Sequence, residues 1–270
     1  MGRMKAVRRR MLNVWGLCLF AFLYAPIVVV MAQSFNSGRF GVTWKGFTWE
    51  WYAALFHNEG IRAATINTLL LAVSSTVIST VLGTSLAYGM SRFRWRWGRA
   101  WEGLIQAPVY VPDVVVAAGF LVFFDVARRF LPGFEPGLRV MILAHATVQL
   151  PFVTLVVRAR MSGLDRSLEE AAHDLGADAW QVFREVTGPF LAPGVMSAAL
   201  LAFTLSLDDF VVSFFMSGPG TTTLPMFIYS SVKRGVTPEV NALSSLLVVL
   251  SALAAWFAMR LGNRFRENAE

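Results

Sequence analysis

The segment Glu170-Ala171-Ala172-His173-Asp174-Leu175-Gly176, followed by Val186-Thr187-Gly188-Pro189, is a polar, helix-forming island between two long apolar stretches. Ser167-Leu168-Glu169-Glu170 has the pattern of a capping box that opens a short helix. Gly176 supplies the turn after this helix, because glycine tolerates positive φ at a helix C-terminus. Asp178 and Gln181 predict a second short helix, which Pro189 ends. A polar loop that is itself folded indicates a membrane protein that meets a partner in the water here.

The rest of the chain predicts an all-α, polytopic membrane protein with six transmembrane helices. Of the 270 residues 56% are hydrophobic, and the mean hydropathy is +0.54. A helix needs about 20 apolar residues to cross the hydrocarbon core of a bilayer. Six segments qualify: Met11–Gln33, Thr65–Met90, Leu104–Asp125, Arg139–Val157, Phe190–Met216 and Ala242–Leu261. We therefore expect one membrane domain over residues 11–262, with the polar loop near 163–189, between tails at 1–10 and 263–270.

The distribution of basic residues predicts the orientation of the chain. Sixteen of the 24 Lys and Arg residues lie in 1–10, 92–99, 158–184 and 260–266, which the six spans place on one side of the membrane. Because cytoplasmic loops carry the excess of Lys and Arg, both termini and the polar loop are expected in the cytoplasm. This asymmetry also accounts for the net charge of +7 without a nucleic-acid partner.

These segments also allow other interpretations, the plainest being a solvated linker helix without a partner. Leu175-Gly176-Ala177-Asp178 with Val182-Phe183 also resembles a DNA-binding helix-turn-helix, but the apolar segments on both sides would hold it against a bilayer. The first apolar segment could be a cleaved signal peptide. Its apolar stretch is longer than a usual signal core, and its removal would leave an odd number of spans.

Three aspartates interrupt the apolar segments. Asp208 and Asp209 are adjacent in the fifth segment, and Asp113 follows Pro108 and Pro112 in the third. An acidic residue near the middle of a span costs about 2.5–3.5 kcal/mol on insertion scales. Adjacent residues of a helix point about 100° apart, so at most one of Asp208 and Asp209 is expected to face a narrow path. Prolines at membrane depth predict a broken helix that lines protein or water.

The sequence leaves two roles open for these carboxylates. In the structural role, Asp113 is an N-cap after Pro112, and Asp208 and Asp209 are caps or members of a buried pair. In the functional role, all three line a path that favours cations, because such groups replace part of the hydration that a charged solute gives up. The aromatic residues Trp44, Trp49, Trp51 and Tyr52 fit an interfacial belt, and Trp51 is the preferred candidate for a cation–π contact with a solute.

No pattern of catalytic or cofactor-binding residues is found in the sequence. The three histidines (His57, His145 and His173) have no metal-ligand spacing, and His145 is predicted to be a hydrogen-bonded core residue. One cysteine excludes an internal disulfide and a thiol-based metal site. No Walker-type loop with Gly-Lys-Ser/Thr is present, so ATP would be bound by a different subunit.

The polar loop resembles the EAA loop of ABC-importer permeases, in which Glu-Ala-Ala is followed after three residues by Gly and later by Leu-Pro. Here Gly188 stands where Leu is usual. Ser206-Leu207-Asp208-Asp209-Phe210, Gly218-Pro219-Gly220 and Pro238-Glu239-Val240-Asn241-Ala242-Leu243 resemble the second permease subunit of spermidine/putrescine importers (PotC/PotI type). Pro112-Asp113 and Trp51-Tyr52 fit the same subunit, and the likeness runs from about residue 10 to residue 260.

This resemblance implies half of a type I ABC importer with the MetI-like permease fold in the inner membrane. The implied partners are a second permease subunit, two copies of a cytoplasmic ATP-binding subunit and a periplasmic polyamine-binding protein. It also implies a coupling role toward the ATPase for Glu170, Ala171, Ala172, Gly176 and Pro189. It implies a place on the substrate path for Trp51, Asp113, Asp208 and Asp209, with no catalytic or metal-binding residue.

Two other functional classes of membrane protein also fit part of the sequence. A self-contained secondary cation transporter would use Asp208 and Asp209 as its ion site, but it would not need an ATPase-docking loop. A membrane enzyme would need a nucleophile–base pair or a metal cluster, and the sequence shows neither. Among importers, the exact solute stays open, since related permeases carry other solutes.

Overall fold

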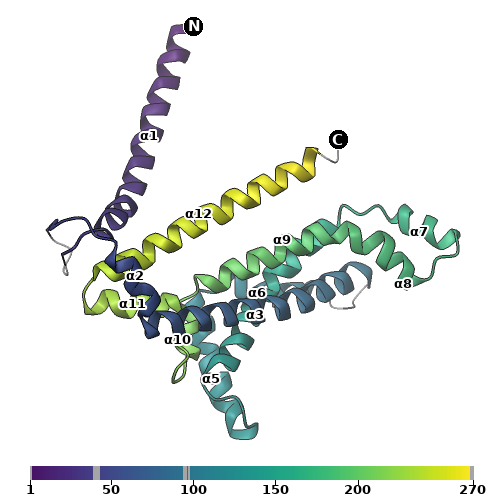
Figure 1. Cartoon of the computed structure of the whole chain (residues 1–270). Helices are drawn as coiled ribbons and strands as arrows, with labels where there is room; N and C mark the ends of the chain where they lie inside the picture. The colour runs from purple at the N-terminus through teal and green to yellow at the C-terminus, as the bar shows by residue number, and fades with distance from the viewer. Residues whose placement is uncertain (1, 39–42, 94–95, 97, 268–270) are drawn as a thin grey trace. The chain divides into compact units, whose positions relative to one another are not determined.

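The computed structural model describes residues 2–38, 43–93, 96 and 98–267, and most of these residues are helical. Figure 1 labels the helices along the chain. They are α1 (Gly2–Gln33), α2 (Glu50–His57), α3 (Glu59–Arg92), α4 (Gly98–Tyr110), α5 (Asp113–Phe130), α6 (Leu138–Met161), α7 (Arg166–Asp174), α8 (Ala179–Val182), the π-helical turn η1 (Phe183–Thr187), α9 (Gly188–Leu207), α10 (Val211–Met216), α11 (Leu224–Arg234) and α12 (Pro238–Glu267). The all-α fold class is confirmed.

Four helical stretches of the described residues are long and apolar enough to cross a membrane. They are Met11–Gln33, Glu59–Arg92, Leu138–Met161 and Ala179–Leu207. The predicted third span is instead a bent pair, Ala100–Tyr110 and Asp113–Phe130, whose axes differ by 109°. The sixth falls in α12, where Pro238–Leu253 forms a shorter apolar helix. The structure thus supports four spans, or five with the bent pair, and the count of six stays a prediction.

The prolines explain the bend in the third segment. Pro108 lies inside α4, and Pro112 stands directly before the first residue of α5. Proline has no N–H to donate, and it disfavours helical backbone in the residue before it. The predicted interruption of this segment is confirmed.

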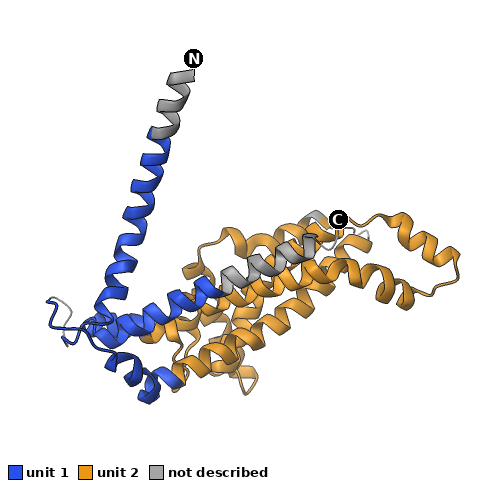
Figure 2. Ribbon diagram, turned by 45° about the horizontal axis from the view of Figure 1, so that its top comes forward, with its two compact units in different colours: residues 1–62, 228–270 blue, residues 63–227 orange. Residues whose placement is uncertain are grey.

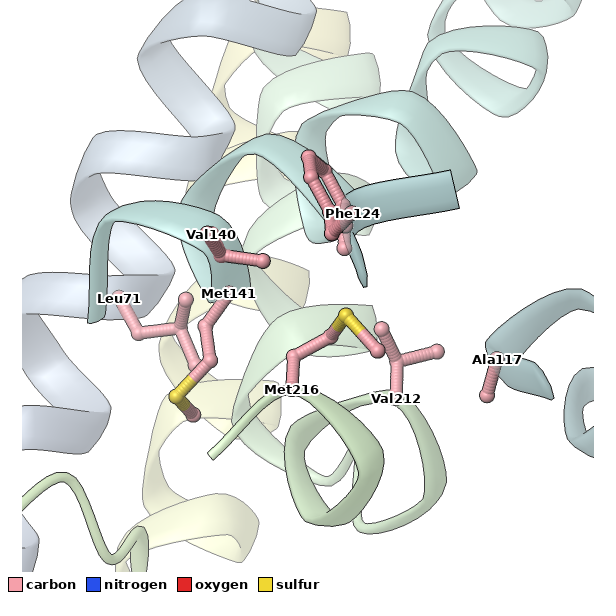
Figure 3. Packing of buried hydrophobic residues seen from close by; sticks show 8 residues of the cluster. Leu71, Ala117, Phe124, Val140, Met141, Val212 and Met216 are labelled. Atoms are coloured by element: carbon pink, nitrogen blue, oxygen red, sulfur yellow. The ribbon is translucent and has the colours of Figure 1, made fainter. Parts of the chain in front are cut away.

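The chain divides into two compact units, residues 1–62 with 228–270 and residues 63–227 (Figure 2). In the second unit a buried apolar cluster joins four helices: Leu71 comes from α3, Phe124 from α5, Met141 from α6 and Met216 from α10. Figure 3 shows these side chains gathered with those of Ala117, Val140 and Val212. This cluster fixes the position of the short helix α10, which follows the two aspartates of the fifth segment.

Small residues let α3, α6 and α9 approach closely in the same unit. A β-carbon at Gly83 of α3 would lie 2.7 Å from Cγ1 of Val153 on α6. Likewise, one at Gly194 of α9 would lie 2.8 Å from the side chain of Arg160 on α6. Membrane helices associate through such close packing, because lipid provides no hydrophobic drive between them.

The first unit contains α1, α2 and α12, and a buried asparagine organises the loop between its first two helices. The side chain of Asn36 donates to the Thr43 carbonyl and accepts from the backbone N–H of Lys45, both at 2.9 Å. Asn58, directly after α2, donates to Glu239 at the start of α12 at 2.7 Å.

Candidate functional site

The fifth apolar segment is not one helix, because it breaks at the two aspartates. Helix α9 ends at Leu207, Asp208 to Phe210 are non-helical, and α10 begins at Val211. The expectation that Asp208 and Asp209 project from one continuous helix is therefore wrong. Their directions are set by the break, and the two side chains have different surroundings.

The carboxylate of Asp209 is held by the start of α10 and by α6. Its Oδ2 accepts from the backbone N–H of Ser213 at 2.8 Å, and its Oδ1 accepts from that of Val212 at 3.3 Å. Its Oδ2 also lies 3.2 Å from Nε2 of His145. The free N–H groups at a helix N-terminus need such an acceptor. Asp209, one residue before the N-cap Phe210, thus accepts from two N–H groups in the first turn of α10 and pairs with a side chain of another helix.

His145 is a buried, hydrogen-bonded residue, as the sequence predicts. Its side chain is 2% exposed. Its Nδ1 lies 2.8 Å from the hydroxyl of Ser206 on α9, and its Nε2 lies 3.1 Å from that of Ser213 on α10. One imidazole therefore joins α6 to both sides of the helix break.

The polar contacts of His145 continue through the interior to α3. The hydroxyl of Ser206 lies 3.3 Å from that of Ser75, which accepts from the side-chain amide of Gln149 at 3.1 Å. The Gln149 carbonyl oxygen accepts in turn from Ser79 at 2.8 Å. These residues are all buried. Buried polar groups need such partners, because an unpaired one loses its hydration without compensation.

Asp208, in contrast, is exposed and marks the C-terminal end of α9. It forms no ion pair within the described part of the chain. Asp113 is also exposed, and it is the first residue of α5 rather than its cap, because Pro112 occupies the N-cap position. The N-cap role considered for Asp113 is therefore wrong. No ion pair or hydrogen bond joins Asp113 to Asp208 or Asp209 among the described residues.

Trp51 lies on α2 in the first unit and is partly buried. Its indole N–H donates to the carbonyl of Asn36 at 2.8 Å. The neighbouring Tyr52 packs with Phe35 and Trp49 in an aromatic cluster, at centroid distances of 5.2 and 5.5 Å. Trp51 thus ties α2 to the loop after α1 through its polar edge.

The polar loop folds as two short helices, but its first cap differs from the prediction. Helix α7 is capped by Asp165, whose side chain accepts from the Ser167 backbone N–H at 3.0 Å. This hydrogen bond holds the pKa of Asp165 below its ordinary value. The predicted capping box of Ser167 and Glu170 is wrong, because Asp165 is an equally good N-cap residue two positions earlier.

The turn and the second helix of the loop follow the prediction. Gly176 has φ = +88°, a conformation that residues with a β-carbon rarely adopt. Asp178 and Gln181 form a reciprocal capping box at the start of α8, with both hydrogen bonds at 2.8 Å.

The prediction that Pro189 ends the second short helix is wrong. The stretch Ala179–Leu207 is one continuous helical span, in which η1 joins α8 to α9. Across the π-helical turn, the backbone N–H of Gly188 bonds the carbonyl of Phe183. Proline is well tolerated in the first turn after such a change of hydrogen-bonding register, since its missing N–H needs no partner there.

The acidic residue that fastens this loop is Glu169, which the sequence interpretation did not single out. Glu169 is buried, and it accepts from Arg92 at the end of α3 and from the hydroxyl of Thr187 in η1. Glu170 is exposed and forms no ion pair among the described residues. Its neighbour in the sequence therefore holds the loop in place and leaves Glu170 facing outward.

The fold and this loop define an integral membrane transport component. The family model described as "Binding-protein-dependent transport system inner membrane component" matches residues 79–267. The chain belongs to this family, which is one of transporter subunits and not of enzymes. The described residues contain no cluster of three or more His, Cys, Asp or Glu side chains that could hold a metal ion.

Two curated relatives align with most of the chain. It is 40% identical over 239 residues to the spermidine/putrescine transport system permease protein PotC of Haemophilus influenzae, covering 88% of this chain and 91% of the relative. It is 40% identical over 253 residues to the putrescine transport system permease protein PotI of Escherichia coli, covering 92% and 90%. A chain of a bacterial ABC transporter for alginate import has the same fold, with a TM-score of 0.75 at 19% identity, covering 98% of this chain and 99% of that one.

Proposed function

We propose that this chain is the second permease subunit of a polyamine ABC importer and forms half of its translocation path. The observation that carries the proposal is the 40% identity, over nearly the whole length of both chains, to permeases named for spermidine and putrescine. Polyamines are polycations, and the exposed carboxylates of Asp113 and Asp208 fit such a solute. Attraction between a carboxylate and a cation is poorly screened where water is scarce.

The coupling loop, residues 163–189, is proposed to dock on a cytoplasmic ATPase. It exposes large apolar side chains as well as charges: Leu175 is 90% exposed, Trp180 66% and Leu168 55%. Exposed apolar residues gathered on one loop are typical of a protein interface. Glu170, Ala171 and Gly176 belong to the same loop, and Ala172 and Pro189 complete the set assigned to coupling.

The complete importer is proposed to contain a second permease subunit, two ATP-binding subunits and a periplasmic polyamine-binding protein. ATP is bound by the ATPase subunits, and this chain needs no cofactor of its own. Both termini and the coupling loop face the cytoplasm, as the distribution of Lys and Arg favours. Membrane lipid surrounds the apolar spans.

The test is uptake by the importer reconstituted in vesicles with its partner subunits. Labelled spermidine or putrescine should accumulate only with external binding protein and internal ATP. Accumulation without ATP, driven by an ion gradient, would instead identify a secondary transporter.

A permease for another solute is the second candidate. The chain is 25% identical over 251 residues to the putative 2-aminoethylphosphonate transport system permease protein PhnV of Salmonella typhimurium, and covers 93% of it. In the same assay an excess of unlabelled 2-aminoethylphosphonate should leave spermidine uptake unchanged. ATP-dependent uptake of this compound, with none of polyamines, would favour the second candidate.

A further inference from the structure

The network around His145 assigns different roles to the two adjacent aspartates. We propose that His145 is a positioning residue that holds Asp209 and the helix break between α9 and α10, so that Asp208 alone of the pair faces the solute. This inference rests on the proposed function, because it concerns the path of the same importer.

Both oxygens of Asp209 are already engaged. Oδ1 accepts from the Val212 backbone N–H, and Oδ2 accepts from the Ser213 backbone N–H and faces Nε2 of His145. If Asp209 turned toward a passing cation, the N–H groups of Val212 and Ser213 would lose their acceptor, and Nε2 of His145 would keep only the hydroxyl of Ser213 as a neighbour. A buried donor that loses its partner is costly. Asp209 is therefore suited to holding structure rather than to releasing and rebinding a solute.

The geometry of the network suits one arrangement of donors around His145. Nε2 lies 3.2 Å from Oδ2 of Asp209, where an imidazole N–H can donate to the carboxylate. Nδ1 lies 2.8 Å from the hydroxyl of Ser206, which can donate to it. The amide of Gln149 donates to Ser75, whose hydroxyl lies 3.3 Å both from the Ala72 carbonyl and from the hydroxyl of Ser206. The polar groups from Gln149 to His145 thus form a connected series that ends at the carboxylate of Asp209, and such hydrogen bonds reinforce one another.

Asp208 is the residue that this arrangement leaves available. It is exposed, it ends α9, and its direction depends on the backbone of the break that Asp209 and His145 hold. A loss of the network should therefore misplace Asp208 without removing its charge. A loss of the Asp208 charge should instead weaken the attraction for the solute itself.

The experiment compares variants in the reconstituted importer with spermidine, a trivalent cation, and putrescine, a divalent one. Asp208→Asn should raise KM, and by a larger factor for spermidine. Asp209→Asn and His145→Asn should each lower the maximal rate about tenfold, by the same factor for both solutes, since a network residue acts through geometry. The double variant should lose no more than either single one, because both changes break the same unit.

His145→Gln is the matched control. The amide nitrogen of glutamine reaches the position of Nε2, whereas that of asparagine reaches the position of Nδ1. Glutamine should therefore keep the hydrogen bond to Asp209 and most of the transport rate. Ser206→Ala, which removes one hydroxyl, provides a milder second variant if His145→Asn does not assemble. It should lower the rate and leave KM unchanged.

Three results would overturn the inference. The first is a KM for Asp209→Asn that rises more for spermidine than for putrescine, as expected for Asp208→Asn. The others are a double variant whose losses in transport rate add up, and a Ser206→Ala variant with unchanged kinetics. Failure of the proposed function itself gives a different result. In that case the wild-type importer transports neither polyamine, while non-additivity between His145 and Asp209 is still measurable in thermal unfolding of the assembled complex.

Discussion

Arg92 at the end of α3 and Glu169 of α7 form an ion pair that fastens the coupling loop to the membrane helices. Both side chains are largely buried, with 19% and 11% exposed. The same carboxylate also accepts from Thr187 in η1. One side chain thus joins the first helix of the loop to the end of α3 and to the turn before α9, while the adjacent Glu170 stays exposed.

Adjacent glutamates should therefore give different phenotypes. Glu169→Ala leaves Arg92 without its partner and should destabilise the loop by roughly 2–3 kcal/mol, at the lower end for a buried pair because both groups retain some exposure. Glu170→Ala should change stability by less than about 0.5 kcal/mol. Hydrogen exchange of residues 166–174 measures the destabilisation of the loop, and co-purification of the ATPase measures docking. Glu170→Ala should weaken docking while the protection of the loop from exchange stays unchanged. Equal protection in both variants would contradict this division.

Gly176 should be sensitive to backbone conformation and not to side-chain volume. A β-carbon there would meet nothing within 4 Å, but φ = +88° disfavours residues other than glycine. Gly176→Val should strain the turn by about 1–2 kcal/mol and separate ATP hydrolysis from uptake. Gly176→Asn is the control, because asparagine tolerates this conformation, and its ratio of solute transported to ATP hydrolysed should stay near wild type. A normal ratio for the valine variant would refute the assigned turn.

Two glycines of α3 offer a matched test of helix packing. Gly83→Ala places a methyl group 2.7 Å from Val153 and should cost about 1–3 kcal/mol. Gly89→Ala meets open space and should be neutral or stabilising by up to about 1 kcal/mol, since alanine favours helix. Thermal unfolding of the purified permease pair in detergent compares them. Similar melting temperatures for the two variants would exclude the close approach of α3 to α6.

Asp113 should contribute charge to the path and little to the fold. As the first residue of α5 it makes no cap hydrogen bond, so Asp113→Asn should lower stability by no more than about 1 kcal/mol, the value of a charge at a helix N-terminus. Uptake of spermidine should fall several-fold while the complex still assembles. Asp125→Asn is the control and should leave uptake near wild type, because the Asp125 carboxylate is already paired with Arg128 and Arg129 of the same helix. Normal uptake by Asp113→Asn would remove Asp113 from the proposed substrate path.

The features that the sequence predicted correctly depend on neighbours within a few residues. Gly176 and the Asp178–Gln181 box are turn and cap signals that act over one to four positions. The apolar stretches and the break near Pro112 are equally local. The cap of α7 was misplaced because Asp165 and Ser167 are both good N-cap residues, and propensity alone does not decide between them.

The site depends on contacts between segments that are distant in the sequence, and for this reason the partners of its residues could not be predicted. Nothing near Asp209 indicates that its partner is His145 of another helix, or that Arg92 selects Glu169 over Glu170. Pro189 looked like a helix end because an α-helix needs the N–H that proline lacks. The π-helical turn before it changes the hydrogen-bonding register, and this turn has no simple sequence signal.

The uninterrupted helical stretch from Ala179 to Leu207 has a mechanical consequence. Its 29 residues form a rod roughly 40 Å long, which begins within the coupling loop and ends at the residue before Asp208. We therefore expect a displacement of α8 to be passed along the rod as tilt or rotation rather than absorbed at Pro189. Two features interrupt the regular α-helical hydrogen bonding of this rod: the π-helical turn η1, where a β-carbon at Gly188 would lie only 2.8 Å from the Phe183 carbonyl, and Pro193 inside α9. We expect the stiffness of the rod at these two places to determine how much of a displacement at the water surface reaches the break at Asp208.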